Sequence, residues 1–486
     1  MNRELKRISA LVVVMFMALF VASSIIQVFQ ADALGADARN ARARADAYKI
    51  QRGQILTSDG KAIVVSKKES ADEYQFQRQY LDGKLYSAVT GYYPINGAPT
   101  GIEGALDAKL AGTGSNQVFD RIQNIVTGQD PKGDSVELTI DPKVQKAAYD
   151  ALGNKRGAVV AIDPSTGAVL AMVSKPSFDP NAIAAHDSSA LRAYSSLLNQ
   201  SPSPLTNRAI AGNLNPPGST FKLIVASAAL ESGKYTESSQ FASPNSLTLP
   251  GTSLVIQNSQ GEVCGTGPKA TLKLALSLSC NIPFAELGDQ LGQKPIADQA
   301  AKFGFGKPLS IPLAVTPSVY PKQALDKAQL AQTAFGQFED RVTPMQMAMV
   351  SAAIGNGGVL MKPNLVKRVL SPALDTVEQM TPQQLAQPVS QKTASAVTDM
   401  MVSSVATGAA TNGRIDGVDV AGKTGTAQNG ANDPYTLWFT GFAPAKNPKV
   451  AVAVVIENGG GLGQSGYGNL LAAPVAKKVM EAVLNK

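Results

Sequence analysis

The sequence contains few of the side chains on which metal sites and acid–base catalysis usually depend. Its 486 residues include one histidine, His186, and two cysteines, Cys264 and Cys280. A four-ligand zinc site of cysteine and histidine is therefore impossible within one chain. A serine–histidine pair would have to use His186, which stands in an ordinary N-A-I-A-A-H-D stretch typical of a solvated surface. Catalysis by histidine is thus nearly excluded.

Charged residues are also scarce. They make up 17% of the chain against 44% apolar residues, which indicates a folded globular protein without a large disordered part. The formal net charge of +7 favours anionic surroundings, but no basic stripe accompanies it, so no nucleic-acid partner is expected. At 486 residues the chain is too long for one ordinary core, and two or three domains are expected.

No charge interrupts residues 8–29, a run of 22 residues. As a helix, this run is long enough to cross a hydrocarbon core of about 30 Å. Ala31-Asp32-Ala33 imitates the cleavage site of a signal peptide, but the apolar part of such peptides spans only about 7–15 residues. We therefore expect an uncleaved transmembrane anchor within residues 1–30. Basic residues lie on both sides of it, so its flanking charges orient it poorly.

Residues 31–150 are expected to form a smaller, mixed, non-catalytic domain. Residues 31–47 are rich in Ala, Arg and Asp and suit a helix. Residues 49–66 suggest a hairpin around a turn at Asp59-Gly60. A polar stretch with Gly and Pro at residues 128–134 is a plausible linker.

Residues 151–486 have the pattern of a larger α+β domain. Residues 157–173 predict two apolar strands joined by a turn, and residues 219–230 predict a buried helix. The chain returns to strands at residues 418–426, 435–443 and 450–457. Strands at both ends with helices between them predict an antiparallel sheet that both ends of the domain complete.

The first candidate site is the pattern S-x-x-K at Ser219 and Lys222. Residues three apart share one face of a helix, and the preceding Pro-Pro-Gly leaves Ser219 at the helix N-terminus, where developing negative charge is favoured. Lys222 is the only charge in residues 219–230, so burial should lower its pKa and let it act as a base. An N-cap serine beside a snorkelling lysine is the alternative interpretation.

The second candidate is the pattern S-x-N at Ser279 and Asn281. It ends a helical run at a point where Pro283 discourages continuation. The hydroxyl could relay a proton, and the amide could hold a substrate carbonyl. Alone the pattern is weak, because Ser and Asn at a helix end usually cap the helix or form a turn.

The third candidate is K-T-G at Lys423, within G-V-D-V-A-G-K-T-G-T-A-Q at residues 417–428. Residues 417–424 also fit the phosphate-binding pattern G-x-x-x-x-G-K-[ST], which needs a strand before its first glycine and a helix from Lys-Thr onward. A-T-N-G-R-I-D precedes Gly417, and glycines and a proline follow Thr424. The phosphate-loop match is therefore interpreted as a coincidence, and a strand is predicted instead.

In the order S-x-x-K, S-x-N, K-T-G, the three patterns resemble the signature of penicillin-binding proteins and serine β-lactamases. The likeness covers nearly the whole chain after the anchor. It is strongest to class B penicillin-binding proteins, and the short ectodomain looks most like the actinobacterial penicillin-binding protein A group. The other segments that match this class are Arg52-Gly53-Gln54-Ile55 with Asp59-Gly60, Thr100-Gly101-Ile102-Glu103, Leu138-Thr139-Ile140-Asp141, Gly336-Gln337 with Thr343-Pro344, and Trp438-Phe439-Thr440-Gly441-Phe442-Ala443-Pro444.

The resemblance implies a transpeptidase/serine β-lactamase-like α+β fold and D,D-transpeptidation between peptidoglycan stem peptides. Ser219 would attack the carbonyl of the penultimate D-Ala, and an amine of a second stem peptide would accept the acyl group. Lys222 would take the proton of Ser219, Ser279 would relay a proton to the leaving amine, and Lys423 would hold Ser279. β-Lactams would acylate Ser219 as substrate mimics, and no metal or other cofactor is required.

The resemblance also implies the substrate-binding residues. Asn281 would hold a substrate carbonyl, and Thr424 would bind the terminal carboxylate. The backbone N–H groups of Ser219 and Thr426 would form the oxyanion hole. Gly425 lies between the two threonines on the same substrate-binding strand.

The implied chemistry gives the chain a place in the cell. Stem peptides lie outside the cytoplasm, so a single-pass plasma-membrane protein with a cytoplasmic N-terminus and an extracellular catalytic domain is expected. A separate glycosyltransferase and division or elongation proteins are the expected membrane partners, because residues 31–150 leave no room for a glycosyltransferase. Outside the cell, Cys264 and Cys280 could form a disulfide, which would stabilise the fold by about 3 kcal/mol; two separately buried thiols are the alternative.

Other functions stay open at this point. A β-lactamase or a D,D-carboxypeptidase would use a similar site and pass the acyl group to water. A β-lactam sensor or a scaffold is the alternative outside enzymes. The complete triple signature argues against lost chemistry, and the seven residues before the anchor are too few for a cytoplasmic signalling domain. A role in cell division is expected, although elongation and sporulation are not excluded.

Overall fold

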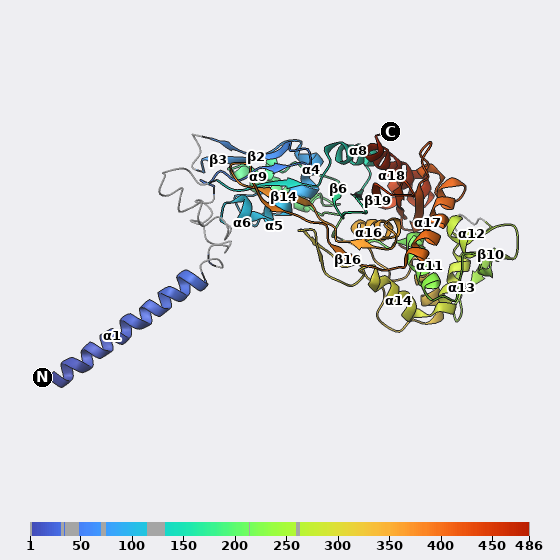
Figure 1. The fold of residues 1–486 in the computed structure, drawn as a ribbon, viewed down its shortest axis with the longest axis horizontal. Coiled ribbons are helices and arrows are strands. Elements are labelled where there is room, and N and C mark those ends of the chain that lie inside the picture. The colour runs from blue at the N-terminus through green and yellow to red at the C-terminus, as the bar shows by residue number, and fades with distance from the viewer. Residues whose placement is uncertain are drawn as a thin grey trace.

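The computed structural model describes residues 2–30, 34, 48–69, 74–113, 132–212, 214–258 and 263–485. The helix predicted at residues 31–47 and most of the linker predicted at residues 128–134 lie outside these ranges. The described chain forms an N-terminal helix that stands apart, a smaller region next to it and a larger region beyond (Figure 1). The C-terminus lies in the larger region, far from the N-terminus.

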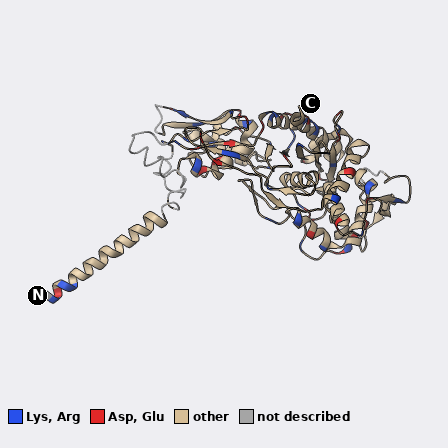
Figure 2. Cartoon of the chain, in the orientation of Figure 1, with Lys and Arg blue, Asp and Glu red and all other residues tan. Residues whose placement is uncertain are grey.

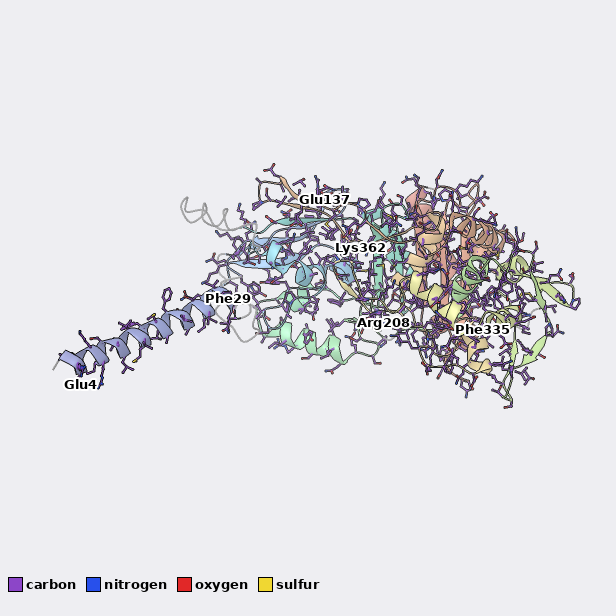
Figure 3. All side chains as sticks on the ribbon, turned by 60° about the horizontal axis from the view of Figure 1, so that its bottom comes forward. Glu4, Phe29, Glu137, Arg208, Phe335 and Lys362 are labelled. Carbon is purple, nitrogen blue, oxygen red and sulfur yellow. A yellow bond between two sulfur atoms is a disulfide. The ribbon has the colours of Figure 1, made fainter. Side chains whose placement is uncertain are left out.

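The N-terminal helix α1 (Asn2–Ser24) continues through one π-helical turn, η1 (Ile25–Phe29). Residues 3–29 are the one span among the described helices that is long and apolar enough to cross a membrane. Its side chains point outward along its whole length from Glu4 to Phe29 (Figure 3). Charges gather at the first turns, and the rest of the helix carries none (Figure 2). The predicted apolar helix is therefore confirmed.

A six-stranded sheet forms the smaller region. Its strand order is β15-β14-β4-β1-β2-β3, and the predicted hairpin around Asp59-Gly60 is the antiparallel pair β1–β2. Two of its strands, β14 and β15, come from the C-terminal half of the chain, which the sequence did not indicate. The strands are β1 (Ile55–Leu56), β2 (Ala62–Lys68), β3 (Phe76–Tyr80), β4 (Ser135–Leu138), β14 (Val366–Leu370) and β15 (Thr376–Gln379).

A buried ion cluster holds this region together. The two oxygens of Glu103 each lie 2.6 Å from a guanidinium nitrogen, one of Arg52 and one of Arg78. Burial alone would raise the pKa of Glu103, but the two guanidinium charges outweigh it and hold the pKa below its ordinary value. Two of the short segments recognised in the sequence, those of Arg52 and Glu103, thus meet in the fold.

A five-stranded antiparallel sheet is the centre of the larger region. Its order is β17-β18-β19-β5-β6, so the two ends of the domain complete one sheet, as predicted. The strands are β5 (Gly157–Ile162), β6 (Val169–Lys175), β17 (Ala421–Ala427), β18 (Thr436–Ala443) and β19 (Val450–Ile456). All seven residues of β19 are buried, because helices cover both faces of the sheet.

The two helical layers differ in origin. Helices α8 (Pro142–Leu152) and α18 (Gly468–Leu484) cover one face, and α16 (Pro344–Gly355) covers the other. Helix α8 spans the domain boundary predicted at residue 150. Because α8 packs on this sheet and on α18, the structure places it with the larger region.

The remaining elements surround these two sheets. The helices are α4 (Gly83–Thr90), α5 (Gly101–Ala105), α6 (Asp107–Leu110), α9 (Asn181–Ala184), α10 (Ser188–Asn199), α11 (Lys222–Glu231), α12 (Leu272–Ser277), α13 (Ile282–Leu291), α14 (Gln293–Lys302), α15 (Lys327–Thr333) and α17 (Gln391–Ala406). The 3-10 turns are η3 (Gly218–Phe221), η5 (Thr411–Gly413), η6 (Asn458–Gly461) and η7 (Gly463–Ser465). The short strands are β7 (Gln240–Ala242), β8 (Ser246–Thr248), β9 (Val255–Gln257), β10 (Lys269–Thr271), β11 (Leu309–Ser310), β12 (Ala314–Val315), β13 (Leu360–Met361) and β16 (Gln384–Ala386).

The single histidine is not a freely solvated surface residue. His186 is half-buried, and its ring meets those of Tyr48 and Tyr74 edge-on at centroid distances of 5.2 Å. The predicted solvated position is therefore wrong, because the local sequence did not reveal the two tyrosines, which come from elsewhere in the chain.

Candidate active site

Ser219 lies in the 3-10 turn η3, and the α-helix α11 begins at Lys222. The single helix predicted from residue 219 is thus a tight turn that leads into a helix. Gly218 has φ of +52°, and its N–H donates to the carbonyl of Gly336 over 2.9 Å. A Cβ on Gly336 would lie 2.0 Å from the Gly218 oxygen, so only glycine lets the two chain segments approach this closely.

Lys222 is fully buried at the start of α11. Its Nζ donates to the backbone oxygen of Ser279 (2.7 Å) and to Oδ1 of Asn281 (2.8 Å). Burial is the main cause of a pKa far below the ordinary lysine value, and the nearby charge of Lys423 lowers it further. This shift makes the neutral amine, which a general base requires, easier to reach than in a solvated lysine.

Lys423 is the second fully buried lysine and comes from the strand β17. Its Nζ donates to Oγ of Ser279 (2.7 Å) and to the backbone oxygen of Thr424 (2.9 Å). Burial lowers the pKa of Lys423 to about 7. Ser279 is thus held at both ends, its carbonyl by Lys222 and its hydroxyl by Lys423.

Backbone geometry places Ser279 between the two lysines. Its φ of +64° is in the left-handed region, which a serine occupies only when its surroundings impose it. Asn281 follows as the N-cap residue of α13 and donates from Nδ2 to the carbonyl of Gln257 (2.8 Å). The S-x-N pattern is therefore a turn between α12 and α13.

Two residues of this site, Gln257 and Asn258, carry no recognisable sequence signal. Oδ1 of Asn258 accepts from the backbone N–H groups of Asn281 (2.9 Å) and Ile282 (3.2 Å). Together with Gln257, this buried side chain fixes the S-x-N turn from the side of β9. A lone Q-N dipeptide more than 20 residues before the turn gives no pattern from which its role could have been found.

A cleft of about 670 Å³ opens beside these groups. Of the catalytic and substrate-binding residues predicted from the sequence, Ser219, Asn281 and Thr426 line it, and Gln337 from the recognised Gly336-Gln337 segment lines it too. Thr424 is buried and donates from Oγ1 to the carbonyl of Ala409 (3.1 Å). A Cβ on Gly425 would come 2.8 Å from the oxygen of Pro217, so β17 can pack directly on the turn that carries Ser219. The three patterns thus form one site.

Cys264 and Cys280 form a disulfide, with their Cα atoms 5.8 Å apart. Cys280 is the middle residue of the S-x-N pattern, so the bridge ties that turn to the segment before β10. The structure therefore has the bridged form and not the alternative of two separate thiols.

The phosphate-loop interpretation of residues 417–424 is excluded by the fold. Gly417 has φ of +71° and lies in a turn before β17, and both Lys423 and Thr424 are inside the strand. A phosphate loop would start a helix at these two residues.

Residues 157–481 match the family model described as the penicillin binding protein transpeptidase domain. The chain belongs to the penicillin-binding proteins. Residues 52–136 match a second family model, the penicillin binding protein A dimerisation domain. The resemblance inferred from the three patterns is therefore confirmed.

Named penicillin-binding proteins align with the chain over its whole length. The peptidoglycan D,D-transpeptidase PbpA of Mycolicibacterium smegmatis is 40% identical over 496 aligned positions that cover 100% of both chains. PbpA of Mycobacterium tuberculosis strain H37Rv is 39% identical and covers 100% of this chain and 99% of its own. The ceftriaxone acyl-enzyme complex of penicillin-binding protein A from M. tuberculosis superposes with a TM-score of 0.86, at 38% identity, over 90% of this chain and 100% of that chain. The penicillin G acyl-enzyme complex of the same protein gives 0.84, at 37% identity, with the same coverage.

Proposed function

We propose that this penicillin-binding protein is a peptidoglycan D,D-transpeptidase that cross-links stem peptides through a serine acyl-enzyme. The relatives named above carry this activity in their names, and their solved complexes with β-lactams are acyl-enzymes. The observation that carries the proposal is the chain of hydrogen bonds from Lys222 through Ser279 to Lys423 beside the cleft that Ser219 lines.

The first half-reaction acylates Ser219. Its Oγ attacks the carbonyl carbon of the penultimate D-Ala, and the neutral amine of Lys222 accepts the hydroxyl proton. The backbone N–H groups of Ser219 and Thr426 stabilise the oxyanion of the tetrahedral intermediate. The C–N bond then breaks, and the terminal D-Ala leaves after its nitrogen receives a proton relayed by the Ser279 hydroxyl.

The second half-reaction transfers the acyl group. The amine of a second stem peptide attacks the ester carbon and loses a proton to the same relay, and Ser219 Oγ leaves and regains its hydrogen. Lys423 orients the Ser279 hydroxyl, Asn281 holds a substrate carbonyl, and Thr424 receives the terminal carboxylate of the donor. Gly425 keeps β17 close enough to the Ser219 turn for these contacts.

The proposed reaction also orients the protein. Stem peptides lie outside the cytoplasm, so α1 crosses the plasma membrane once. Its N-terminus lies in the cytoplasm, and the smaller and the larger region both lie outside. A separate glycosyltransferase and division or elongation proteins in the same membrane are the proposed partners, and cell division is the proposed process.

Labelling with a fluorescent penicillin tests the nucleophile. Wild type is expected to form a long-lived covalent adduct, and Ser219→Ala none. Undiminished labelling of the alanine variant would show that another residue is acylated. Rapid release of hydrolysed drug from the wild type would favour a β-lactamase.

Product analysis separates the remaining alternatives. Release of D-Ala that depends on an added amine, with a cross-linked product, is expected of a transpeptidase. A rate of D-Ala release that does not change when the amine is added would identify a D,D-carboxypeptidase. Acylation by penicillin without D-Ala release from any stem peptide would favour a sensor or a scaffold.

A further inference from the structure

The cleft beside Ser219 adjoins a second lobe at the end of β17. The catalytic lobe, of about 670 Å³, contains Ser219, and the distal lobe, of about 750 Å³, reaches Arg156 and Arg341. Both lobes are bordered by Gln337 and Gln428. The two lobes therefore adjoin, and these two glutamines stand between them with Tyr435 and Gln464.

The edge of β17 runs along these lobes. Because β17 is the edge strand of its sheet, every second residue turns its backbone N–H and C=O away from β18. Thr424 is one of these residues, since its carbonyl accepts from Nζ of Lys423 on the side of the active site. In steps of two, Thr426 and Gln428 present their backbone groups in the same direction.

The backbone of Gln428 already has a partner. When the side-chain amide of Gln337 is turned so that its nitrogen faces the carbonyl of Gln428, it donates to that carbonyl (3.2 Å) and accepts from the N–H of Gln428 (3.0 Å), and the opposite orientation satisfies neither group. An antiparallel strand added at this edge would make the same pair of hydrogen bonds. Gln337 is held in place by its neighbour Gly336, whose carbonyl accepts from the N–H of Gly218 in the turn of Ser219.

We propose that Gln337 determines how far a peptide donor can pair with β17, an inference that rests on the proposed transpeptidase function. A donor that ends its pairing at Thr426 leaves the contact between Gln337 and Gln428 intact. A donor that extends further toward its own N-terminus must break that contact before it can pair with Gln428 and enter the distal lobe. Gln337 is thus a specificity-determining residue that acts against long peptide donors.

The test compares a long and a short donor in the Gln337→Ala variant. With the same amine acceptor present at a fixed concentration, we measure D-Ala release from a pentapeptide ending in D-Ala-D-Ala and from N-acetyl-D-Ala-D-Ala, and divide the kcat/KM value of the pentapeptide by that of N-acetyl-D-Ala-D-Ala. Because a net hydrogen bond changes an equilibrium constant about fivefold, the ratio is expected to rise about fivefold or more. The change should be in the KM of the pentapeptide, with its kcat retained.

Two further variants separate specificity from a structural role. Gln337→Glu keeps the size and the acceptor but cannot donate to the carbonyl of Gln428, so an intermediate ratio is expected. Gln332→Ala is the matched control, because Gln332 also lines the catalytic lobe but, among the residues that the structure describes, its side chain donates within its own helix, to Ala328. Its ratio should equal that of wild type. A ratio that is unchanged or lowered in Gln337→Ala overturns the proposal, as does a Gln332→Ala effect of equal size.

A binding measurement keeps this test independent of turnover. Each donor competes with a fluorescent penicillin for Ser219, and the slowing of labelling gives a dissociation constant for each. In Gln337→Ala the dissociation constant of the pentapeptide is expected to fall about fivefold relative to that of N-acetyl-D-Ala-D-Ala. Absence of D-Ala release from both donors in the wild type would contradict the proposed function, whereas an unchanged ratio of dissociation constants would contradict the role of Gln337 alone.

Discussion

Two lysines share one buried site, and their charges set its behaviour with pH. Lys222 and Lys423 are both fully buried and are bridged by Ser279, so two protonated amines would repel each other across one residue. Burial holds the pKa of Lys423 at about 7, well below its value in an unfolded chain. The site therefore favours at least one neutral amine at neutral pH, which suits a base that must accept the proton of Ser219.

This pKa predicts how stability changes with pH. Between pH 7 and about 10.5, the unfolded chain keeps the proton of Lys423 while the folded protein has lost it, so the free energy of unfolding rises with pH in this window. One such group contributes a slope of up to about 1.4 kcal/mol per pH unit. Lys423→Met should lose this contribution, so its melting temperature should rise less from pH 7 to 9 than that of wild type. Parallel curves for the two proteins would contradict the assigned pKa.

Asn258 offers a second prediction at the scale of one side chain. It accepts two backbone N–H groups at the start of α13, so Asn258→Ala leaves both without their partner. A lost cap destabilises a helix end by about 1 kcal/mol, and penicillin acylation of Ser219 should slow about fivefold as the S-x-N turn loosens. Asn258→Asp keeps an acceptor and is the matched control. Equal acylation rates in the alanine variant and the wild type would show that the turn does not need this contact.

Residues that belong to a pattern were predictable, and residues that act through tertiary contact were not. Ser219, Ser279 and Lys423 stand in short motifs whose order is informative. Asn258 reaches the S-x-N turn only because β9 folds against it. The segment of Gln337 was recognised in the sequence, but its meeting with Gln428 was not, because it depends on the loop after α15 lying against the end of β17. The two partners of such a contact lie at no characteristic spacing in the sequence, so no motif search can find them.

At the scale of elements, strands with strong apolar runs were predictable and the β14–β15 pair was not. β19 reads V-A-V-A-V-V-I and is buried on both faces, which a continuous apolar run indicates. β14 and β15 read V-K-R-V-L and T-V-E-Q, short runs with charges in their centres. β15 pairs with β14, and the other partner of β14, β4, comes more than 220 residues earlier, with Arg368 opposite Glu137; no local pattern records a pairing of that kind.

The disulfide between Cys264 and Cys280 fixes the position of one turn relative to a neighbouring segment, and its removal gives the third prediction. The bridge closes a loop of 16 residues and holds the turn between α12 and α13 by its middle residue. In the loop-entropy account, replacing both Cys264 and Cys280 with alanine should lower the free energy of unfolding by about 3 kcal/mol. Urea denaturation of the variant and of wild type measures this difference. The wild type treated with a thiol reductant should approach the stability of the variant, and a reductant effect on the variant itself would point to another cause.

At the scale of the whole molecule, the chain crosses between its two main regions more than once. It leaves the six-stranded sheet after β4, builds most of the larger region, and returns through β14 and β15 before it completes the five-stranded sheet. Glu137 lies in the six-stranded sheet, away from Phe335 at the active-site end of the molecule (Figure 3). A chain that returns in this way makes the stability of each region depend on the other.

Glu137 on β4 forms ion pairs with the returning strand β14, and these pairs give the last prediction. Its buried carboxylate lies 2.6 Å from Nζ of Lys367 and 2.6 Å from Nε of Arg368, both on β14. Glu137→Gln keeps the shape but removes the charge, and because the side chain is only 2% exposed, the free energy of unfolding should fall by about 2 kcal/mol. Thermal denaturation measures the loss, while penicillin acylation of Ser219 at 25 °C should be retained, since Glu137 is far from the cleft. Glu378→Gln is the matched control, because Glu378 lies on β15 of the same sheet and pairs with Lys109 of α6, but is 37% exposed, where an ion pair contributes about 0–1 kcal/mol. If the two variants lost the same stability, the buried pair at Glu137 would not be what fastens β14, and the backbone pairing of β14 with β4 would have to hold the two regions together alone.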